Sequence, residues 1–150
     1  LLSLSRNIFF YRDLNLKDCF ETRIYLMFFH FSLILIIYKQ KKQKFSQKSY
    51  DSLFHNIENN LRELGFGDVA VNKKMKDLNK ILYDILLKIN KDNQGRFELN
   101  KRLINKYFVE FNGRNNQKFA DFEQYFNNFY NFCFDISLDN MIREIVKFKK

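Results

Sequence analysis

The sequence predicts an all-α protein, a single compact bundle of five or six helices, and two observations carry this prediction. The chain of 150 residues contains no proline and only four glycines, so helices can run unbroken and tight hairpins are disfavoured. Hydrophobic residues make up 46% of the chain, enough for one domain with a sizeable core. We assign residues 17–150 to this helical domain and expect residues 1–16 to be a poorly ordered N-terminal segment.

The first long apolar run, residues 24–38, predicts a central helix. IYLMFFHFSLILIIY has 15 residues and would span about 22 Å, whereas a bilayer-spanning helix needs about 20 apolar residues. We therefore favour a buried helix over a transmembrane one. An interfacial helix is the alternative, because the lysines of the following KQKKQK would lie at the level of lipid headgroups.

Two amphipathic helices are expected next. In SQKSYDSLFHNIENNLRELG (46–65), Ser46 or Ser49 can cap the start, and Gly65 suits the left-handed position past the end. Its apolar residues follow the 3.6-residue period, namely Tyr50, Leu53, Phe54, Ile57, Leu61 and Leu64. A third helix should start near Asn72, which would cap it. The apolar face of this helix comprises Met75, Leu78, Leu82, Ile85, Leu86 and Ile89.

The C-terminal half predicts three more helices separated by polar breaks, KDNQG (91–95) and FNGRNNQ (111–117). The first is marked by Leu99, Leu103, Ile104, Tyr107 and Phe108. The second has an aromatic face made of Phe119, Phe122, Phe126, Phe129, Tyr130 and Cys133. A short last helix after Ser137 carries Leu138, Met141, Ile142, Ile145 and Val146.

The stretch G-F-G-D-V-A (65–70) is compatible with three interpretations. The dinucleotide fingerprint G-x-G-x-x-A requires a strand before the turn and a helix directly after it. Here a helix precedes, and the next helix is expected about five residues after the second glycine, which argues against this fingerprint. A DNA-binding helix-turn-helix needs a turn of three or four residues, shorter than Gly65–Val71, so we expect no DNA partner.

The third interpretation is a rigid structural corner. Gly65 would end one helix, Gly67 would permit a bend, and Asp68 would accept hydrogen bonds from backbone amides of the turn. Val69 and Val71 would both anchor the connector on the core. The residues alone lead to a corner between two helices and to no specific ligand.

The remaining chemistry-bearing residues indicate binding and no catalysis. The net charge of +9 favours contact with lipid headgroups, RNA or an acidic partner, or serves solubility. Cys19 and Cys133 are interpreted as buried thiols in a reducing compartment, with a disulfide as the alternative. His30 is interpreted as a core residue in preference to a haem or metal ligand. Without a nucleophile–base set, metal spacing or a phosphate loop in context, we expect no enzyme activity, no cofactor and no metal.

The segment LRELGFGDVAVNKKMK (61–76) resembles the signature of the ubiquinol–cytochrome c chaperone family, assembly factors of respiratory complex III. The resemblance covers roughly residues 20–90. Its matching positions are Leu61, Arg62, Glu63, Gly65, Gly67, Asp68, Val71, Lys73 and Met75.

The resemblance implies a non-enzymatic chaperone that binds newly made cytochrome b during complex III assembly. The composition agrees with this, because a groove lined by Phe and Met can hold varied apolar segments. It implies a peripheral location on the cytoplasmic face of the bacterial inner membrane, or on the matrix side in mitochondria. Further partners would be a small partner subunit, the ribosome or an anionic membrane surface. The alternatives are a peripheral RNA- or ribosome-binding basic protein and a small membrane-anchored protein.

Two sets of residues at the corner are candidates for specific roles. The first would be read by the client or partner and comprises Arg62, Glu63, Lys73, Lys74 and Lys76. The second would build the structural turn and comprises Gly65, Gly67, Asp68 and Val71. For Arg62 and Asp68, a local network that holds the corner rigid is the alternative to direct client contact.

Overall fold

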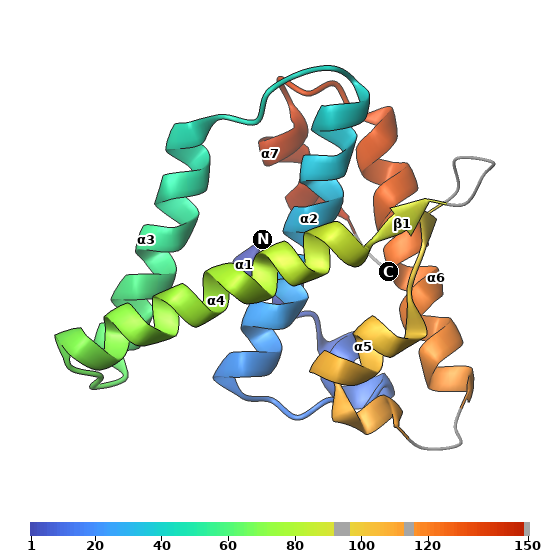
Figure 1. Cartoon of the computed structure of the whole chain (residues 1–150). Coiled ribbons are helices and arrows are strands. Elements are labelled where there is room, and N and C mark those ends of the chain that lie inside the picture. The colour runs from blue at the N-terminus through green and yellow to red at the C-terminus, as the bar shows by residue number, and fades with distance from the viewer. Residues whose placement is uncertain (92–96, 113–115, 149–150) are drawn as a thin grey trace.

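The computed structural model describes residues 1–91, 97–112 and 116–148, with Asn90, Lys91 and Asn116 described by their backbone alone. The all-α prediction is confirmed, although the described residues form seven α-helices and not five or six (Figure 1). They are α1 (Leu2–Ser5), α2 (Phe20–Gln40), α3 (Gln47–Glu63), α4 (Asp68–Lys88), α5 (Lys101–Tyr107), α6 (Asn116–Asp135) and α7 (Met141–Glu144). A π-helical turn covers Phe9–Asp13, and 3₁₀ turns cover Val109–Phe111 and Ile145–Lys147.

Two short strands depart from the all-helical expectation. β1 (Asn90–Lys91) pairs antiparallel with β2 (Phe97–Glu98). The Phe97 ring is 6% exposed and stacks on Tyr130 of α6 with ring centres 5.8 Å apart, so burial of this ring holds β2 against α6. Residues 92–96 and 113–115, on which most of the two expected polar breaks fall, lie outside the described residues.

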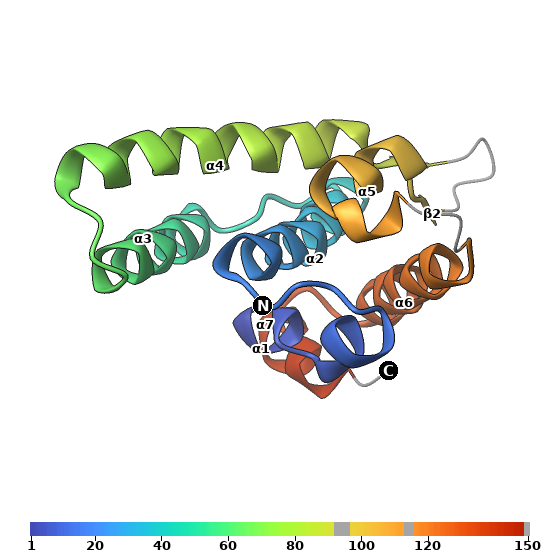
Figure 2. The same ribbon diagram turned by 90° about the horizontal axis from the view of Figure 1, so that it is seen from below.

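The helices lie in three layers around α2 (Figure 2). α4 and α5 cover one side of α2, and α3 and α6 flank it in the middle layer. α1, the π-helical turn and α7 form the third layer on the side opposite α4. The most extensive contacts of α2 are with α4, α1 and α6, so every layer is anchored on this one helix.

Burial on nearly all sides explains the apolar composition of α2. A helix without a polar face has to be surrounded by other elements, and its fully buried side chains include Leu26, Phe28, Phe29 and Leu33. The prediction of a buried helix over residues 24–38 is confirmed, and the helix extends beyond this run at both ends. Within the described residues α2 is the one helix long and apolar enough to cross a bilayer, and 67% of its most apolar window is buried inside the protein.

Residues 1–16 are part of the core, which corrects the expectation of a poorly ordered segment. Phe10 of the π-helical turn is fully buried, with its ring centre 4.7 Å from that of Tyr125. Burying a side chain of this size contributes about 1.5–3 kcal/mol, which opposes the conformational entropy lost on ordering the segment. The buried apolar residues of the segment are Leu4, Phe9, Phe10, Leu14 and Leu16.

His30 lies on α2 and is fully buried among aromatic rings. Its Nδ1 is 2.6 Å from the Leu26 carbonyl oxygen, which can only accept, so Nδ1 carries the proton. Nε2 therefore accepts from the Tyr125 hydroxyl at 3.0 Å. Burial lowers the pKa of His30 to about 3, so the ring is neutral at pH 7. The interpretation of His30 as a hydrogen-bonded core histidine is confirmed. The aromatic rings around His30 are those of Phe10, Tyr125, Phe126 and Phe129.

Both cysteines are free thiols. Cys133 on α6 is fully buried, and burial raises the pKa of its thiol to about 12. Cys19 is only half-buried at the start of α2, with its Sγ 3.3 Å from the Thr22 hydroxyl. The prediction of a buried thiol is therefore confirmed for Cys133 and is wrong for Cys19.

His30 should make stability depend on pH between 7 and 5.5. The unfolded state takes up a proton as the pH falls through about 6.5, whereas the folded state does so only near pH 3. Because the folded pKa is depressed, stability is complete above the unfolded pKa and is lost as the pH falls below it. We expect urea unfolding to show a loss of about 1.2 kcal/mol between pH 7 and pH 5.5.

The two histidines of the chain provide a matched pair for this measurement. His30→Gln retains a donor and an acceptor but cannot titrate, so its stability should be nearly constant over this range. His55→Gln, at an exposed position of α3, should keep the dependence of the wild type. An equal loss in the wild type and in His30→Gln would mean that other groups cause it.

Candidate functional site

The two glycines of the G-F-G-D-V-A stretch form a tight corner between α3 and α4, at one end of the molecule (Figure 1). Gly65 has a φ of +91°, and its amide donates to the Arg62 carbonyl at 2.9 Å. The Phe66 amide donates to the Leu61 carbonyl at 3.2 Å. These two bonds form a Schellman motif, which satisfies the last carbonyls of α3. The prediction that Gly65 ends the helix in the left-handed conformation is confirmed.

α4 begins at Asp68, so the expected start near Asn72 is wrong. Gly67 takes the N-cap position in an extended conformation, where glycine is well accepted. The Asp68 carboxylate in the first turn interacts favourably with the positive end of the helix dipole. Val71 is fully buried, as expected, but Val69 is 85% exposed. Residues two positions apart in sequence lie about 200° apart around a helix, so these valines cannot share a face.

The corner is shorter than the sequence predicted, which changes the arguments against the dinucleotide fingerprint and against the DNA-binding helix-turn-helix. α4 follows the second glycine directly, and only residues 64–67 separate the two helices, so the length arguments no longer apply. The dinucleotide fingerprint is still excluded, because α3 and not a strand precedes the turn. The Asp68 carboxylate argues against a DNA-binding helix-turn-helix, because this negative charge at the N-terminus of the recognition helix would face the DNA phosphates.

Arg62 connects the two helices at the corner. Its Nη2 lies 2.8 Å from Glu58 of α3, and its Nη1 bonds the carboxylate of Asp68 on α4. The hydrogen bonds with Asp68 and Glu58 raise the pKa of the Arg62 guanidinium. Asp68 thus forms the local network with Arg62 that we gave as the alternative to client contact, and its carboxylate pairs with Arg62 in place of the backbone amides of the turn. Surface ion pairs contribute little to stability, so the Schellman motif carries most of the rigidity.

The three predicted lysines follow the corner along α4 and do not converge on one point. The Lys74 Nζ lies 4.6 Å from the centre of the Phe66 ring, a cation–π contact. Lys73 and Lys76 are exposed, and neither forms an ion pair with any residue that the structure describes. These two charges are therefore available to a partner.

Three exposed apolar side chains at the corner were absent from the predicted site. Leu64 is 58% exposed, Phe66 is 37% exposed, and Val69 is the most exposed of the three. Leu64 was assigned to the buried stripe of its helix, but it lies at the C-cap, where the chain turns away from the core. In the sequence, Phe66 was the signal that could have revealed this apolar surface, because an aromatic residue between two glycines has no helix face to bury it.

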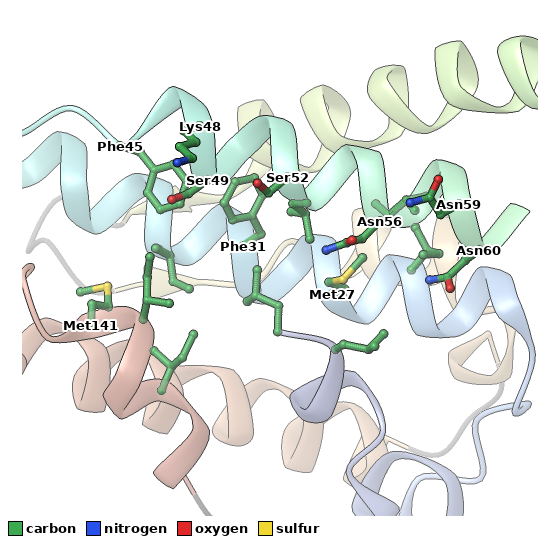
Figure 3. Close-up of a pocket in the computed structure, with 18 of the residues that line it drawn as sticks. Met27, Phe31, Phe45, Lys48, Ser49, Ser52, Asn56, Asn59, Asn60 and Met141 are labelled. Atoms are coloured by element: carbon green, nitrogen blue, oxygen red, sulfur yellow. The ribbon is translucent and has the colours of Figure 1, made fainter.

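A groove of about 700 Å³ lies between α3 on one side and α1 and α7 on the other, with α2 as its floor (Figure 3). Leu2 of α1 and Ile142 of α7 line it and remain 44% and 56% exposed. Its other apolar lining residues are Leu1, Ile24, Met27, Phe31, Ile34, Phe45, Leu53, Ile57, Met141 and Ile145. The lining contains Phe and Met, as expected for a groove that holds apolar segments, together with more Ile and Leu.

α3 supplies the polar rim of this groove (Figure 3). The rim consists of Lys48, Ser49, Ser52, Asn56, Asn59, Asn60 and Glu63. Of the predicted site residues, Glu63 lines the groove, whereas Arg62, Lys73, Lys74 and Lys76 are not part of its lining. The structure therefore separates the predicted residues into a corner group and one groove residue.

The corner and the groove have the chemistry of binding surfaces. They offer apolar contact, amide and hydroxyl hydrogen bonds and a few charges. In residues 1–91, 97–112 and 116–148, no group of three or more His, Cys, Asp or Glu side chains could hold a metal ion. His30 is enclosed in the core and cannot reach a ligand at either surface.

Comparison with known proteins gives one match. The family model described as Ubiquinol-cytochrome C chaperone matches residues 12–125, which include α2, α3, the corner and α4. The comparison with curated proteins and the comparison with solved structures each return no match.

Gly65→Ser and Gly67→Ser test the corner with the same substitution. No atom lies within 4 Å of the Cβ position at either glycine, so neither substitution creates a steric clash. Gly65→Ser should lower the free energy of unfolding by about 1–2 kcal/mol, because serine is forced into the left-handed region. Gly67→Ser should raise it by about a few tenths of a kcal/mol, since serine is favoured at an N-cap. Urea unfolding measures both, and equal losses would refute the assigned geometry.

Proposed function

Because this chain belongs to the ubiquinol–cytochrome c chaperone family, we propose that it binds newly made cytochrome b and assists assembly of the ubiquinol–cytochrome c reductase, complex III. The family match over residues 12–125 is the observation that carries this proposal. A chaperone role follows from membership in the family, and the proposal adds the identity of the client. The protein acts by binding, without a catalytic step.

The exposed surface of the corner supports a protein client with apolar segments. Leu64, Phe66 and Val69 offer apolar contact at a projecting end of the molecule. Lys73 and Lys76 follow on α4 as exposed charges that have no ion-pair partner among the described residues. Exposed apolar side chains rimmed by charged residues are typical of protein interaction sites.

We place the protein peripherally at the membrane face where cytochrome b is inserted, the cytoplasmic side in bacteria or the matrix side in mitochondria. The net charge of +9 supports this, because anionic lipid headgroups attract a basic surface. A small partner subunit and the ribosome are further expected contacts at this location.

A tagged, crosslinked purification from detergent-solubilised source cells, read by mass spectrometry, tests the client. Cytochrome b should be recovered with the wild type and should fall by about tenfold with Val69→Asp combined with Lys73→Glu. Both side chains are exposed on α4, and an aspartate in the first turn of α4 interacts favourably with the helix dipole, so the variant should fold.

Val109→Asp combined with Lys44→Glu is the matched control. It makes the same chemical changes at exposed positions away from the corner, and it should recover cytochrome b like the wild type. Recovery of ribosomal proteins and RNA without cytochrome b, with a steep loss on raising salt, would contradict the proposal and favour the RNA-binding alternative.

A further inference from the structure

The groove between α3 and α7 has opposite charges at the two ends of its rim. Lys48 stands in the first turn of α3 and Glu63 is its last residue, and both line the groove. Neither forms an ion pair with another residue of the described ranges. At 1.5 Å per residue the two positions are about 22 Å apart along α3.

Between these charges the rim is uncharged but rich in hydrogen-bonding groups. Ser49, Ser52, Asn56 and Asn59 follow one another along α3 and face the groove (Figure 3). Their hydroxyl and amide groups can donate and accept without the desolvation cost of a buried charge. An occupant can therefore place polar side chains against α3 along the whole length of the groove.

The opposite wall is apolar and incompletely covered. Leu2 of α1 and Ile142 of α7 line the groove and keep about half of their surface exposed. Met27 of α2 and Met141 of α7 also line the groove, and methionine adapts its shape to different apolar partners. One side of the groove is thus apolar and the other polar, which matches the two faces of an amphipathic helix.

We propose that this groove binds one amphipathic helix of about 15 residues from a protein partner, with an acidic residue at the Lys48 end and a basic residue at the Glu63 end. The length follows from the separation of the two rim charges, and the charge order follows from their signs. Only the identity of the protein that supplies the helix, the client, rests on the proposed function.

Other occupants fit the groove less well. A single fatty acid could place its carboxylate at Lys48, but it would leave Glu63 and the row of amides without partners. RNA would meet one lysine and a carboxylate over an apolar floor, which cannot neutralise several phosphates. Charge complementarity therefore favours a helix that carries both signs.

Three labelled helical peptides with one amphipathic sequence test the charge order by fluorescence anisotropy with the full chain. They differ only in one residue near each end, as acid–base, acid–acid and base–base pairs. The acid–base peptide should bind about fivefold more tightly than the other two. Glu63→Lys should transfer this preference to the acid–acid peptide, and Lys48→Glu should transfer it to the base–base peptide.

Ser52→Trp tests whether the peptides occupy the groove. Ser52 is exposed on the rim, so a tryptophan there should fill the groove without unfolding α3 and should weaken all three peptides by about tenfold. His55→Trp, on the same helix but outside the groove lining, is the control and should leave binding unchanged. Failure of all peptides to bind, or binding unaffected by Ser52→Trp, would overturn the proposal. Saturable binding of palmitate alone, blocked by Ser52→Trp, would also overturn it in favour of a lipid.

The tagged purification distinguishes the groove proposal from the proposal that cytochrome b is the client. Cytochrome b lost with Ser52→Trp and retained with His55→Trp would support the groove as the site of the client helix. If cytochrome b is retained with Ser52→Trp and the peptides fail, the groove proposal falls while the proposed function stands. If the peptides follow the charge rule but cytochrome b is never recovered, the groove proposal stands and the client is wrong.

Discussion

The burial of α2 is the constraint on which the rest of the structure depends. This helix has apolar residues on every side, so water has to be excluded around its whole circumference. One partner helix covers only a stripe, and for this reason α4, α1 and α6 approach α2 from different directions. The three layers, and the recruitment of residues 1–16 into the core, are consequences of covering one helix completely.

The same constraint explains the arrangement of the few polar groups inside. A neutral His30 can remain in the apolar centre because the Leu26 carbonyl and the Tyr125 hydroxyl satisfy both ring nitrogens. The bond with the Tyr125 hydroxyl also connects α2 with α6, and the His30 ring packs against the rings of Tyr125 and Phe126. The histidine thus specifies how the two helices pack, and the aromatic rings around it leave no path to a ligand.

The two candidate surfaces arise where the cover of α2 ends. α3 and α4 continue past the core to the corner, where the Schellman motif at Gly65 leaves apolar side chains in solvent. On the side opposite α4, the short helices α1 and α7 only partly fill the space beside α3, and the groove remains. A family of chaperones has to hold another protein, and both surfaces combine apolar contact with charges that can orient it.

The sequence by itself determined the all-α class, the buried helix over residues 24–38 and the helix end at Gly65, because these depend on local spacing and backbone chemistry. It offered Ser46 or Ser49 as the cap of α3, and the structure assigns the cap to Ser46, whose hydroxyl accepts from the Ser49 amide. The signature at the corner also identified the family from the sequence. Only the tertiary structure decided that α4 starts at Asp68, since a glycine N-cap is a weak signal and the burial of Val71 favours the longer helix. It likewise decided the groove, which joins segments far apart in the chain. No local pattern encodes such a contact, because its free energy comes from excluding water between surfaces that meet only in the folded state.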